Sequence, residues 1–486
     1  MCLPLFLTAC LLTTTALAKP PFDRTAWRQD YAQLKRELVE RYVNLAWKGS
    51  RESGIDLPTL DQKTLAALAS ASDDAQAADA IRAFVDGFHD GHLSEVPYLE
   101  PASGRAAEPE APALDGAQPA TGCAALGYAS TGQTAFSLPI EGLPGFKLVS
   151  DGFNSTFRTG TITRAGVTLG LVRIHNFRAR AFVQACLHAW EDLRQTDKTF
   201  TPDALRDAAQ LRWFADLATA IADLRQVGAT ALVVDIGNNS GGDDSGDWTA
   251  RLLTSKPVRS ARLFMVDAPV SRQYFADQIE EIDAALALAK SAEAKAALAD
   301  ARSFFTRQTA AIGRQRCDLS WVWRERRRWS SGNCRRLIAA GYAGGYAPGL
   351  TPKAFDDAKA AIALSSPSLV ERFFGAWNGP TFVLADKRSY SSAEMFAAVM
   401  QDNGIAKLVG SRTGGDGCGF MADGEPIVLH HSRLRFRVPN CMRLRADGTN
   451  EEAGITPDLP VLATEGESAR ARGERALRLI VDSVGG

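Results

Sequence analysis

Apolar residues recur at helical spacing through the first part of the chain. From residue 22 to about residue 85 they fall at every third or fourth position, which is typical of amphipathic helices that bury one face. The first group is Trp27, Tyr31, Leu34, Leu38 and Leu45, and the second is Leu65, Leu68, Ile81, Phe84 and Val85. The pattern stops where Gly87, Gly91 and Pro97 interrupt the chain. We therefore predict a helical cap over residues 19–95.

The pattern changes after residue 145, where short apolar runs of strand length dominate. These runs are 145–149, 160–163, 167–174, 231–236 and 381–385. An amphipathic pattern over 202–227 predicts a long helix that leads directly into the run at 231–236, as in a crossover between parallel strands. The sequence therefore predicts an α/β fold whose core spans residues 146–486.

Two stretches interrupt this plan. Residues 96–145 include a segment rich in Pro, Ala and Glu, which is typical of a linker or an irregular region. Residues from about 260 to 350 are expected to be an insertion, because an alanine-rich helical pattern over 274–309 separates the core strands. We expect no PDZ domain, since no PDZ-like segment fits between Ser94 and Gly160.

The composition is that of an ordinary globular protein. The chain has 486 residues, 45% of them hydrophobic and 23% charged, so it can bury a sizeable core. Its formal net charge of −1 argues against a nucleic-acid partner, because such binding needs a concentrated positive surface. No segment after the N-terminus has the ~20 consecutive apolar residues that span a bilayer. The sequence leaves the oligomeric state undetermined.

The N-terminus predicts export. A short apolar stretch ends in Ala-Leu-Ala at 16–18, the small-residue pattern of a cleavage site, so residues 1–18 are expected to be a signal peptide. The mature protein would then be periplasmic or extracellular. Residues 7–10 also resemble a bacterial lipoprotein box, which would place a lipid anchor on Cys10. We rank this alternative second, because the stretch before Cys10 is short and lacks Lys or Arg.

Cysteine usage agrees with export. After cleavage six cysteines remain, an even number that permits three disulfides, although the sequence alone does not decide the pairing. Two of the expected pairs bracket compact segments and the third takes the remaining cysteines: Cys317 with Cys334, Cys418 with Cys441, and Cys123 with Cys186. None of the six has CxxC spacing, so neither a metal nor a redox site is expected among them.

Two distant segments together have the features of a serine-nucleophile site. The apolar run at 231–236 stops in a turn that ends with Gly241 and Gly242. Two glycines let a substrate carbonyl approach free backbone N–H groups, as an oxyanion hole requires. The run at 381–385 is followed by a serine-rich turn and a helix that Gly404 ends. A serine at this helix N-terminus is well placed to carry developing negative charge.

Four motifs in order resemble a known family. DIGNNSGG (235–242) resembles a D-[LI]-R-x-N-x-G-G strand-turn, with Gly237 in place of the arginine, and SSAE with the later LVGSRTGG resembles a nucleophile segment. DGH (90–92) resembles the loop after the cap, and GITPDLPV (454–461) resembles the closing strand. Together they resemble the tail-specific, or C-terminal processing, family of serine peptidases. This implies a crotonase-like (ClpP-like) ββα core.

The resemblance implies a serine endopeptidase that cleaves a peptide or protein substrate through an acyl-enzyme. Ser391, three residues before Glu394, would be the nucleophile, and the N–H groups of Ser392 and of Gly241 or Gly242 would bind the oxyanion. Ser391 and Glu394 also form the S-x-x-E pattern of a helix capping box, which alone favours a structural role. The family order of the motifs favours the nucleophile.

The resemblance also implies the base and its acid. Asp416 stands where the Ser/Lys branch of the family has its lysine, so the chain is more similar to the tricorn-type branch, in which a histidine after the cap is the base. This implies His92 as the base and Glu451 as its acidic partner, with Glu452 as the second choice. A histidine base predicts activity that rises towards neutral pH, because only the neutral imidazole accepts a proton.

Departures from the family pattern keep an alternative open. A serine precedes the histidine in the tricorn-type branch, whereas this chain has Gly91, and Ser389 is the candidate that would bridge the acid and the base. His89 with Asp86 and Asp90 lacks a matching second set of metal ligands, so we expect no metal and no cofactor. The alternative function is a catalytically degenerate, ligand- or protein-binding member of the same fold in the cell envelope.

Overall fold

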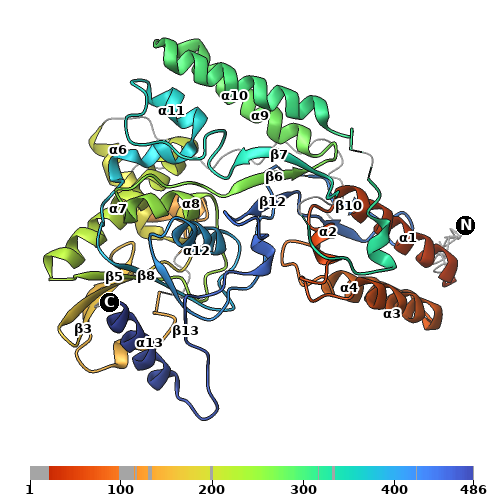
Figure 1. Ribbon diagram of the computed structural model, residues 1–486, viewed down its shortest axis with the longest axis horizontal. Helices are drawn as coiled ribbons and strands as arrows, with labels where there is room; N and C mark the ends of the chain where they lie inside the picture. The colour runs from red at the N-terminus through yellow and green to blue at the C-terminus, as the bar shows by residue number, and fades with distance from the viewer. Residues whose placement is uncertain are drawn as a thin grey trace, which may run out of the picture.

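The computed structural model describes residues 21–97, 114, 118–129, 134–196, 201–315, 317–330, 334–422 and 424–484. A seven-stranded sheet forms its centre, in the order β13-β9-β8-β5-β4-β3-β2 (Figure 1). In the same order the strands are Leu459–Pro460, Lys407–Gly410, Thr381–Ala385, Ala231–Asp235, Val167–Arg173, Arg158–Arg164 and Lys147–Asp151. The predicted α/β class is confirmed.

The sheet is parallel from β13 to β4 and antiparallel from β4 to β2. Helix α7 (Pro202–Gln226) makes the predicted crossover between β4 and β5. Because β5 and β8 are parallel neighbours, with Asp235 opposite Leu384, their carboxyl ends lie at the same edge. This register brings the glycine turn after β5 next to the serine turn after β8.

Both faces of the sheet are covered. Leu232 and Val234 of β5 pack in one core cluster with α7 and with α12 (Ser392–Asp402). Ala231 and Val233 pack on the other face with α13 (Ala469–Val484). All five residues of β5 are buried, which explains why this strand appears in the sequence as an unbroken apolar run.

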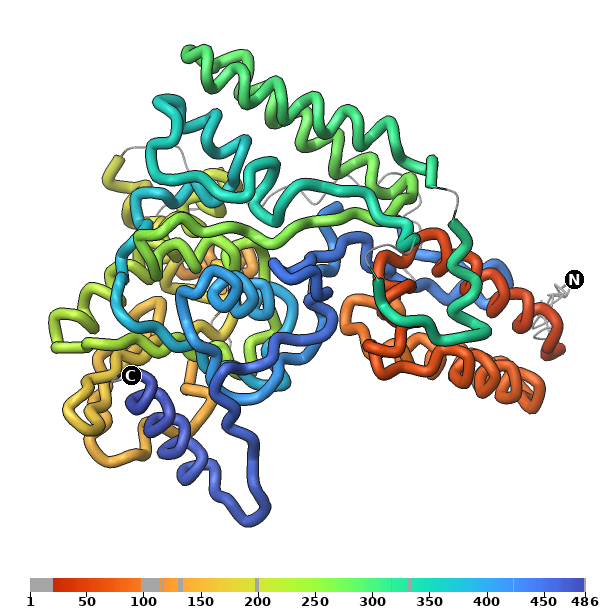
Figure 2. The backbone as a smooth tube through the Cα atoms, in the orientation of Figure 1, coloured from red at the N-terminus to blue at the C-terminus, as the bar shows by residue number. Residues whose placement is uncertain are grey.

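The N-terminal cap is a separate helical layer at one end of the molecule, red and orange in Figure 2. Its apolar stripe packs against a C-terminal hairpin rather than against the central sheet. Strand β1 of the cap pairs antiparallel with β11, which pairs antiparallel with β10 to form the hairpin. The elements are α1 (Arg24–Arg41), α2 (Leu45–Lys48), α3 (Leu57–Ser70), α4 (Asp74–Asp86), β1 (Ser94–Glu95), β10 (Ile427–Val428) and β11 (Arg435–Arg437).

The insertion at about 260–350 contributes a helical hairpin and a second sheet. Helices α9 (Ser271–Leu288) and α10 (Ala292–Ala311) lie along the upper edge of Figure 1. Strand β6 (Arg262–Val266) pairs antiparallel with β7 (Leu337–Tyr342) and with β12 (Cys441–Leu444). The insertion is thus fastened to the C-terminal part of the core through β12.

The structure contains the three expected disulfides, Cys123–Cys186, Cys317–Cys334 and Cys418–Cys441. Within 96–145 the described residues form α5 (Pro119–Ala125) and η1 (Ile140–Gly142), and Cys123 ties α5 to α6 (Val183–Gln195). The remaining short helices are η2 (Ala179–Ala181), α8 (Ser245–Thr249), η3 (Ala250–Leu253), η4 (Ser320–Trp323), α11 (Ala358–Leu364), η5 (Ser366–Phe373) and η6 (Glu451–Ala453).

The expected signal peptide, with Cys10, lies outside the described residues. Among the helices that are described, none combines the length and the apolarity needed to cross a bilayer.

Candidate active site

Ser391 stands at the junction between β8 and α12. It is the N-cap residue of α12, and its backbone angles are φ 54° and ψ −114°. Residues with a side chain rarely adopt such angles, and the strain persists only where the surrounding structure imposes it. A strained turn from strand to helix is also the geometry that exposes a serine hydroxyl as a nucleophile. The conformation of Ser391 therefore favours a functional role.

The glycine turn packs directly against this serine. A methyl group on Gly241 would lie 2.7 Å from Cβ of Ser391, so only glycine permits the close approach. The N–H of Gly241 donates to Oδ1 of Asn239 at 2.8 Å and is therefore not free to bind an oxyanion, which corrects the expectation for this residue. The N–H groups of Gly242 and Ser392 donate no hydrogen bond within the described part of the chain. These two remain the candidate donors.

The buried carboxylate of Glu394 organises both Ser391 and the loop after β9. Its donors are the N–H of Ser391 (3.1 Å), Asp416 (2.8 Å) and Gly417 (3.1 Å) on Oε2, and the Thr413 hydroxyl (2.6 Å) and the Gly415 N–H (2.7 Å) on Oε1. Burial raises the pKa of Glu394 to about 7, although the hydrogen bonds to its carboxylate oppose this rise. The capping pattern in the sequence thus corresponds to a wider hydrogen-bond centre.

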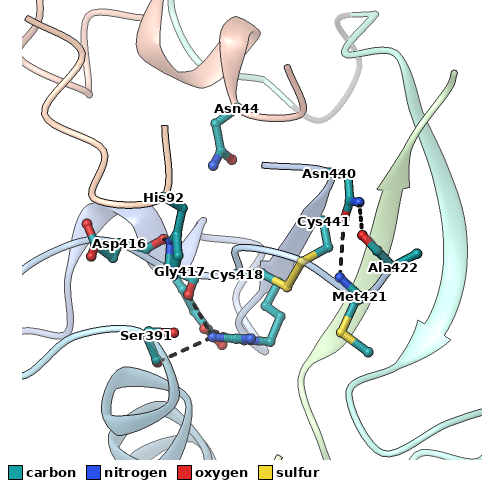
Figure 3. Close-up of a disulfide and its surroundings, with 12 residues drawn as sticks. Asn44, His92, Ser391, Asp416, Gly417, Cys418, Met421, Ala422, Asn440 and Cys441 are labelled. Carbon is teal, nitrogen blue, oxygen red and sulfur yellow. Dashed lines mark hydrogen bonds and ion pairs between the residues drawn. A yellow bond between two sulfur atoms is a disulfide. The ribbon is translucent and has the colours of Figure 1, made fainter. Parts of the chain in front are cut away.

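His92 contacts the same loop, as Figure 3 shows. Its Nδ1 lies 3.1 Å from the backbone oxygen of Asp416. Because a carbonyl oxygen only accepts, Nδ1 must carry the proton in this bond, which leaves Nε2 as an acceptor. Gly419 packs against the ring so closely that a methyl group there would lie 2.8 Å from Nε2. The ring of Phe420 meets the imidazole edge-on, with centroids 5.9 Å apart.

No hydrogen bond joins the Ser391 hydroxyl directly to the imidazole of His92 in the structure. The two residues are linked indirectly. The Glu394 carboxylate accepts the backbone N–H groups of Ser391 and Asp416, and the Asp416 carbonyl accepts from Nδ1 of His92. Catalytic hydrogen bonds are often long before substrate binds and tighten afterwards.

Asp416 explains why glycine precedes His92. Its Oδ1 accepts the N–H of Gly91 at 2.9 Å, and a side chain at Gly91 would collide with the carboxylate. Burial raises the pKa of Asp416, while the Gly91 N–H and the nearby His92 oppose the rise. Asp416 stands in the place of the family lysine, and its carboxylate leaves room only for glycine where the family has a serine. The two departures from the family pattern are therefore linked by one contact.

Asp90 is the carboxylate that holds the His92 loop from the cap side. Its Oδ1 accepts the backbone N–H groups of His92 at 2.9 Å and of Leu93 at 3.3 Å. Its Oδ2 accepts a hydrogen bond from the hydroxyl of Tyr42 at 2.6 Å. Oδ1 lies 4.0 Å from Nδ1 of His92. Asp90, His92 and Asp416 offer ligand atoms within 4.8 Å of one another. The oxygens of Asp90 already accept from protein donors, which favours a role in orienting the loop.

The adjacent glutamates 451 and 452 face different partners. Glu451 accepts from Nε of Arg443 at 2.6 Å, and Glu452 pairs with Nζ of Lys48 at 2.8 Å. Neither carboxylate hydrogen-bonds His92, so the structure does not bring Glu451 to the base, and its supporting role stays a prediction. The physical reason is the 3-10 turn of η6, in which successive side chains project about 120° apart, so that Glu451 faces Arg443 of β12 and Glu452 faces Lys48 of the cap.

Lys48 places a buried positive charge beside the His92 loop, with 4% of its side chain exposed. Burial lowers the pKa of Lys48, but Glu452 and Asp90 outweigh burial and leave it raised. Burial raises the pKa of Glu452 well above its usual range, Asp90 adds to the rise, and Lys48 opposes it. A lysine thus lies near the site in space, although it comes from the cap and not from the loop after β9.

Ser389 does not bridge an acid to His92. Its hydroxyl donates to the carbonyl of Ile236 at 2.8 Å and accepts the N–H of Asp386 at 3.1 Å. It therefore ties the end of β5 to the turn after β8, and the structure does not place it between an acid and His92.

The sequence pattern did not single out Lys48, Arg443 or Asp90 as contributors to this site. Asp90 was visible within DGH, but Lys48 lies in a short helix and Arg443 lies between apolar residues of a strand, where neither spacing nor composition marks them.

Comparison with known proteins identifies the family and the fold. The model of peptidase family S41 matches residues 168–461. The fold is similar to the solved structures of mature CPAF and of mature CPAF complexed with lactacystin, each with a TM-score of 0.56. The identities are 14% and 15%, and each alignment covers 95% of this chain and 99% of the other. No curated protein matches the sequence.

Proposed function

This chain belongs to peptidase family S41 and is a serine-type peptidase, and from that premise we propose that it cleaves peptide bonds through an acyl-enzyme on Ser391. Nε2 of His92 takes the hydroxyl proton as Ser391 attacks the substrate carbonyl, and later returns it to the leaving amine. The bond from Nδ1 to the Asp416 carbonyl supports this role, because it keeps Nε2 unprotonated. The N–H groups of Gly242 and Ser392 bind the oxyanion, each contributing about 3 kcal/mol.

Asp90 takes the role of the acid in this proposal. Its Oδ1 accepts the backbone N–H of His92 at 2.9 Å and lies 4.0 Å from Nδ1 of the imidazole, whereas neither glutamate hydrogen-bonds His92. A carboxylate 4.0 Å from Nδ1 stabilises the imidazolium that forms during attack. Glu451 acts on the other side of the site, through Arg443.

The observation that carries the proposal is the backbone of Ser391. Its backbone has strained angles, and its N–H donates to the Glu394 carboxylate, which also accepts from the loop that binds His92. A serine that only capped a helix would need neither the strain nor the shared anchor.

A fluorophosphonate probe tests the nucleophile. The wild-type protein should be labelled and should hydrolyse casein, whereas Ser391→Ala should do neither while keeping its fold. Ser303→Ala, at an exposed serine of α10, is the control and should be labelled like the wild type. Equal labelling of Ser391→Ala would remove the assignment. A wild-type protein that binds peptides without labelling or turnover would instead be the degenerate binding member.

We also propose that the protein is exported. Three disulfides support this, because such bonds persist in oxidising compartments. N-terminal sequencing of the mature protein should begin at Lys19, and a lipid-modified Cys10 at the N-terminus would indicate the lipoprotein route instead.

A further inference from the structure

The Cys418–Cys441 disulfide lies beside the proposed catalytic residues (Figure 3). It joins the loop after β9 to β12, and its two residues are 2% and 0% exposed. Cys123–Cys186 is equally buried but joins α5 to α6 in a different core cluster. The protein therefore contains one disulfide at the site and a comparable one away from it.

On the loop side, the neighbours of Cys418 hold the imidazole. The carbonyl of Asp416 accepts from Nδ1 of His92, and Gly419 packs against the face of the ring. The loop position of Cys418, between these two contacts, therefore decides where the imidazole lies.

On the strand side, Cys441 sets the position of a guanidinium that reaches the nucleophile. Arg443, two residues further along β12, is anchored by Glu451 at 2.6 Å. It donates to the carbonyl of Gly417 at 2.9 Å and to that of Ser391 at 3.4 Å. The strand thus contacts both halves of the site.

Asn440 adds hydrogen bonds between the same two segments. Its side chain donates to the carbonyl of Ala422 at 2.7 Å and accepts the N–H of Met421 at 3.1 Å. Its backbone N–H donates to the carbonyl of Gly419 at 3.0 Å. The disulfide is the covalent member of a clamp whose other members are hydrogen bonds.

We propose that the Cys418–Cys441 disulfide positions His92 relative to Ser391, so that full peptidase activity requires this bond. The proposal rests on the proposed roles of Ser391 and His92. Without the cross-link the loop and β12 are joined by hydrogen bonds alone. A displacement of about 1 Å in a catalytic group lowers turnover by roughly 100-fold. Substrate affinity should change little, because the disulfide is buried away from solvent.

This positioning role makes activity depend on redox state. When the bond forms, the two thiols lose two electrons and two protons to a disulfide oxidant, which is reduced to a dithiol. Dithiothreitol reverses the step by giving two electrons and two protons to the Sγ–Sγ bond and closing into its own cyclic disulfide. We therefore expect the chain to reach full activity only in an oxidising compartment.

The first test compares two disulfide-free pairs. In C418A/C441A, kcat for a peptide substrate should fall by about 10- to 100-fold with KM within about twofold. In C123A/C186A, kcat should stay within about twofold of the wild type, although its melting temperature falls as well. Equal kcat values in C418A/C441A and the wild type would overturn the proposal, as would equal losses in both variants.

A second readout needs no turnover and separates this proposal from the assignment of function. The ¹⁵N NMR shifts of the His92 ring should report the Nδ1–H tautomer in the wild type and a mixture in C418A/C441A. An unchanged tautomer overturns the positioning role whether or not the protein hydrolyses peptides. Failure of the wild type to be labelled at Ser391 would contradict the assignment of function alone.

A third measurement applies where C418A/C441A does not fold. The folded wild type is treated with dithiothreitol, open cysteines are alkylated, and mass spectrometry identifies which pair has opened. Activity should fall in step with the opening of Cys418–Cys441. Retained activity with this pair open, or a loss that follows another pair, would contradict the proposal.

Discussion

Glu394 accepts the backbone N–H of Ser391 at 3.1 Å, and the same carboxylate oxygen accepts the N–H of Asp416 at 2.8 Å. One buried group thus fixes the serine at the start of α12 and the loop that binds His92. The capping pattern S-x-x-E and the catalytic interpretation of this serine are therefore compatible, because the cap is part of what holds the site.

We expect Glu394→Gln to lower kcat by about 100-fold through displacement of the loop. The amide keeps the shape of the side chain but replaces one acceptor oxygen by an NH₂ group, which faces protein donors whichever way it is turned. The unsatisfied donors should also lower the free energy of unfolding by about 1–3 kcal/mol. Peptide hydrolysis and urea unfolding measure the two effects. Glu474→Gln, in an ion pair with Arg164 at the surface, is the control, and a Glu394→Gln enzyme with normal kcat would refute the role.

The second prediction concerns the contact between Gly419 and His92. A methyl group at this position would lie 2.5 Å from Cδ2 of the imidazole, so Gly419→Ala must displace the ring. We expect kcat to fall by about 10- to 100-fold with KM nearly unchanged. Gly142→Ala adds a methyl group with no atom within 4 Å and should have no effect. Steady-state kinetics of both variants test this expectation. Equal kcat values for Gly419→Ala and Gly142→Ala would show that a displaced imidazole does not lower turnover.

The third prediction concerns the buried ion pair between Lys48 and Glu452. Lys48→Met leaves a carboxylate buried without its cation, which should lower the free energy of unfolding by about 3–5 kcal/mol. Adding Glu452→Gln should restore most of this loss. Urea unfolding measures both, and Arg302→Met, in an exposed ion pair with Asp283, should cost less than about 1 kcal/mol. A small change in the free energy of unfolding of Lys48→Met would mean that the Glu452 carboxylate is not desolvated.

The fourth prediction is a loss of stability in mild acid that depends on His175. Burial, with nearby Arg173, lowers the pKa of His175 from 6.5 to about 4, and its Nε2 has no hydrogen-bond partner among the described residues. The unfolded chain therefore binds this proton at higher pH than the folded protein does. Stability should fall as the pH drops from 6.5 to about 4, by about 3 kcal/mol in total.

Urea unfolding between pH 4 and pH 7 measures this dependence. His175→Phe keeps an uncharged ring of similar shape and should flatten the curve, whereas His430→Gln, at an exposed histidine, should leave it unchanged. Curves of equal slope for His175→Phe and the wild type would assign the dependence to other groups.

Much of the fold could be predicted because periodicity reports burial directly. The apolar run at 231–236 is buried on both faces of the sheet, and the stripe that includes Tyr31 and Leu34 is the buried face of α1. The cap–hairpin contact through β1 and β11 could not be predicted, since strands of two and three residues carry no detectable alternation.

In the site, only residues that belong to a recognisable sequence motif could be predicted. Ser391, His92 and the glycine turn are marked by local patterns, and the structure brings them to one region. Which of two adjacent glutamates faces which partner depends on the turn of η6, and this direction is not encoded in spacing.

His92 lies near the start of the chain, whereas Ser391 and the Lys48 partner Glu452 lie near its end. A ribosome therefore completes the proposed base long before the proposed nucleophile, and Lys48 of the cap meets its counter-charge Glu452 only when synthesis is almost finished. With the proposed roles of Ser391 and His92, a chain that ends before residue 391 has no nucleophile and cannot hydrolyse a peptide bond.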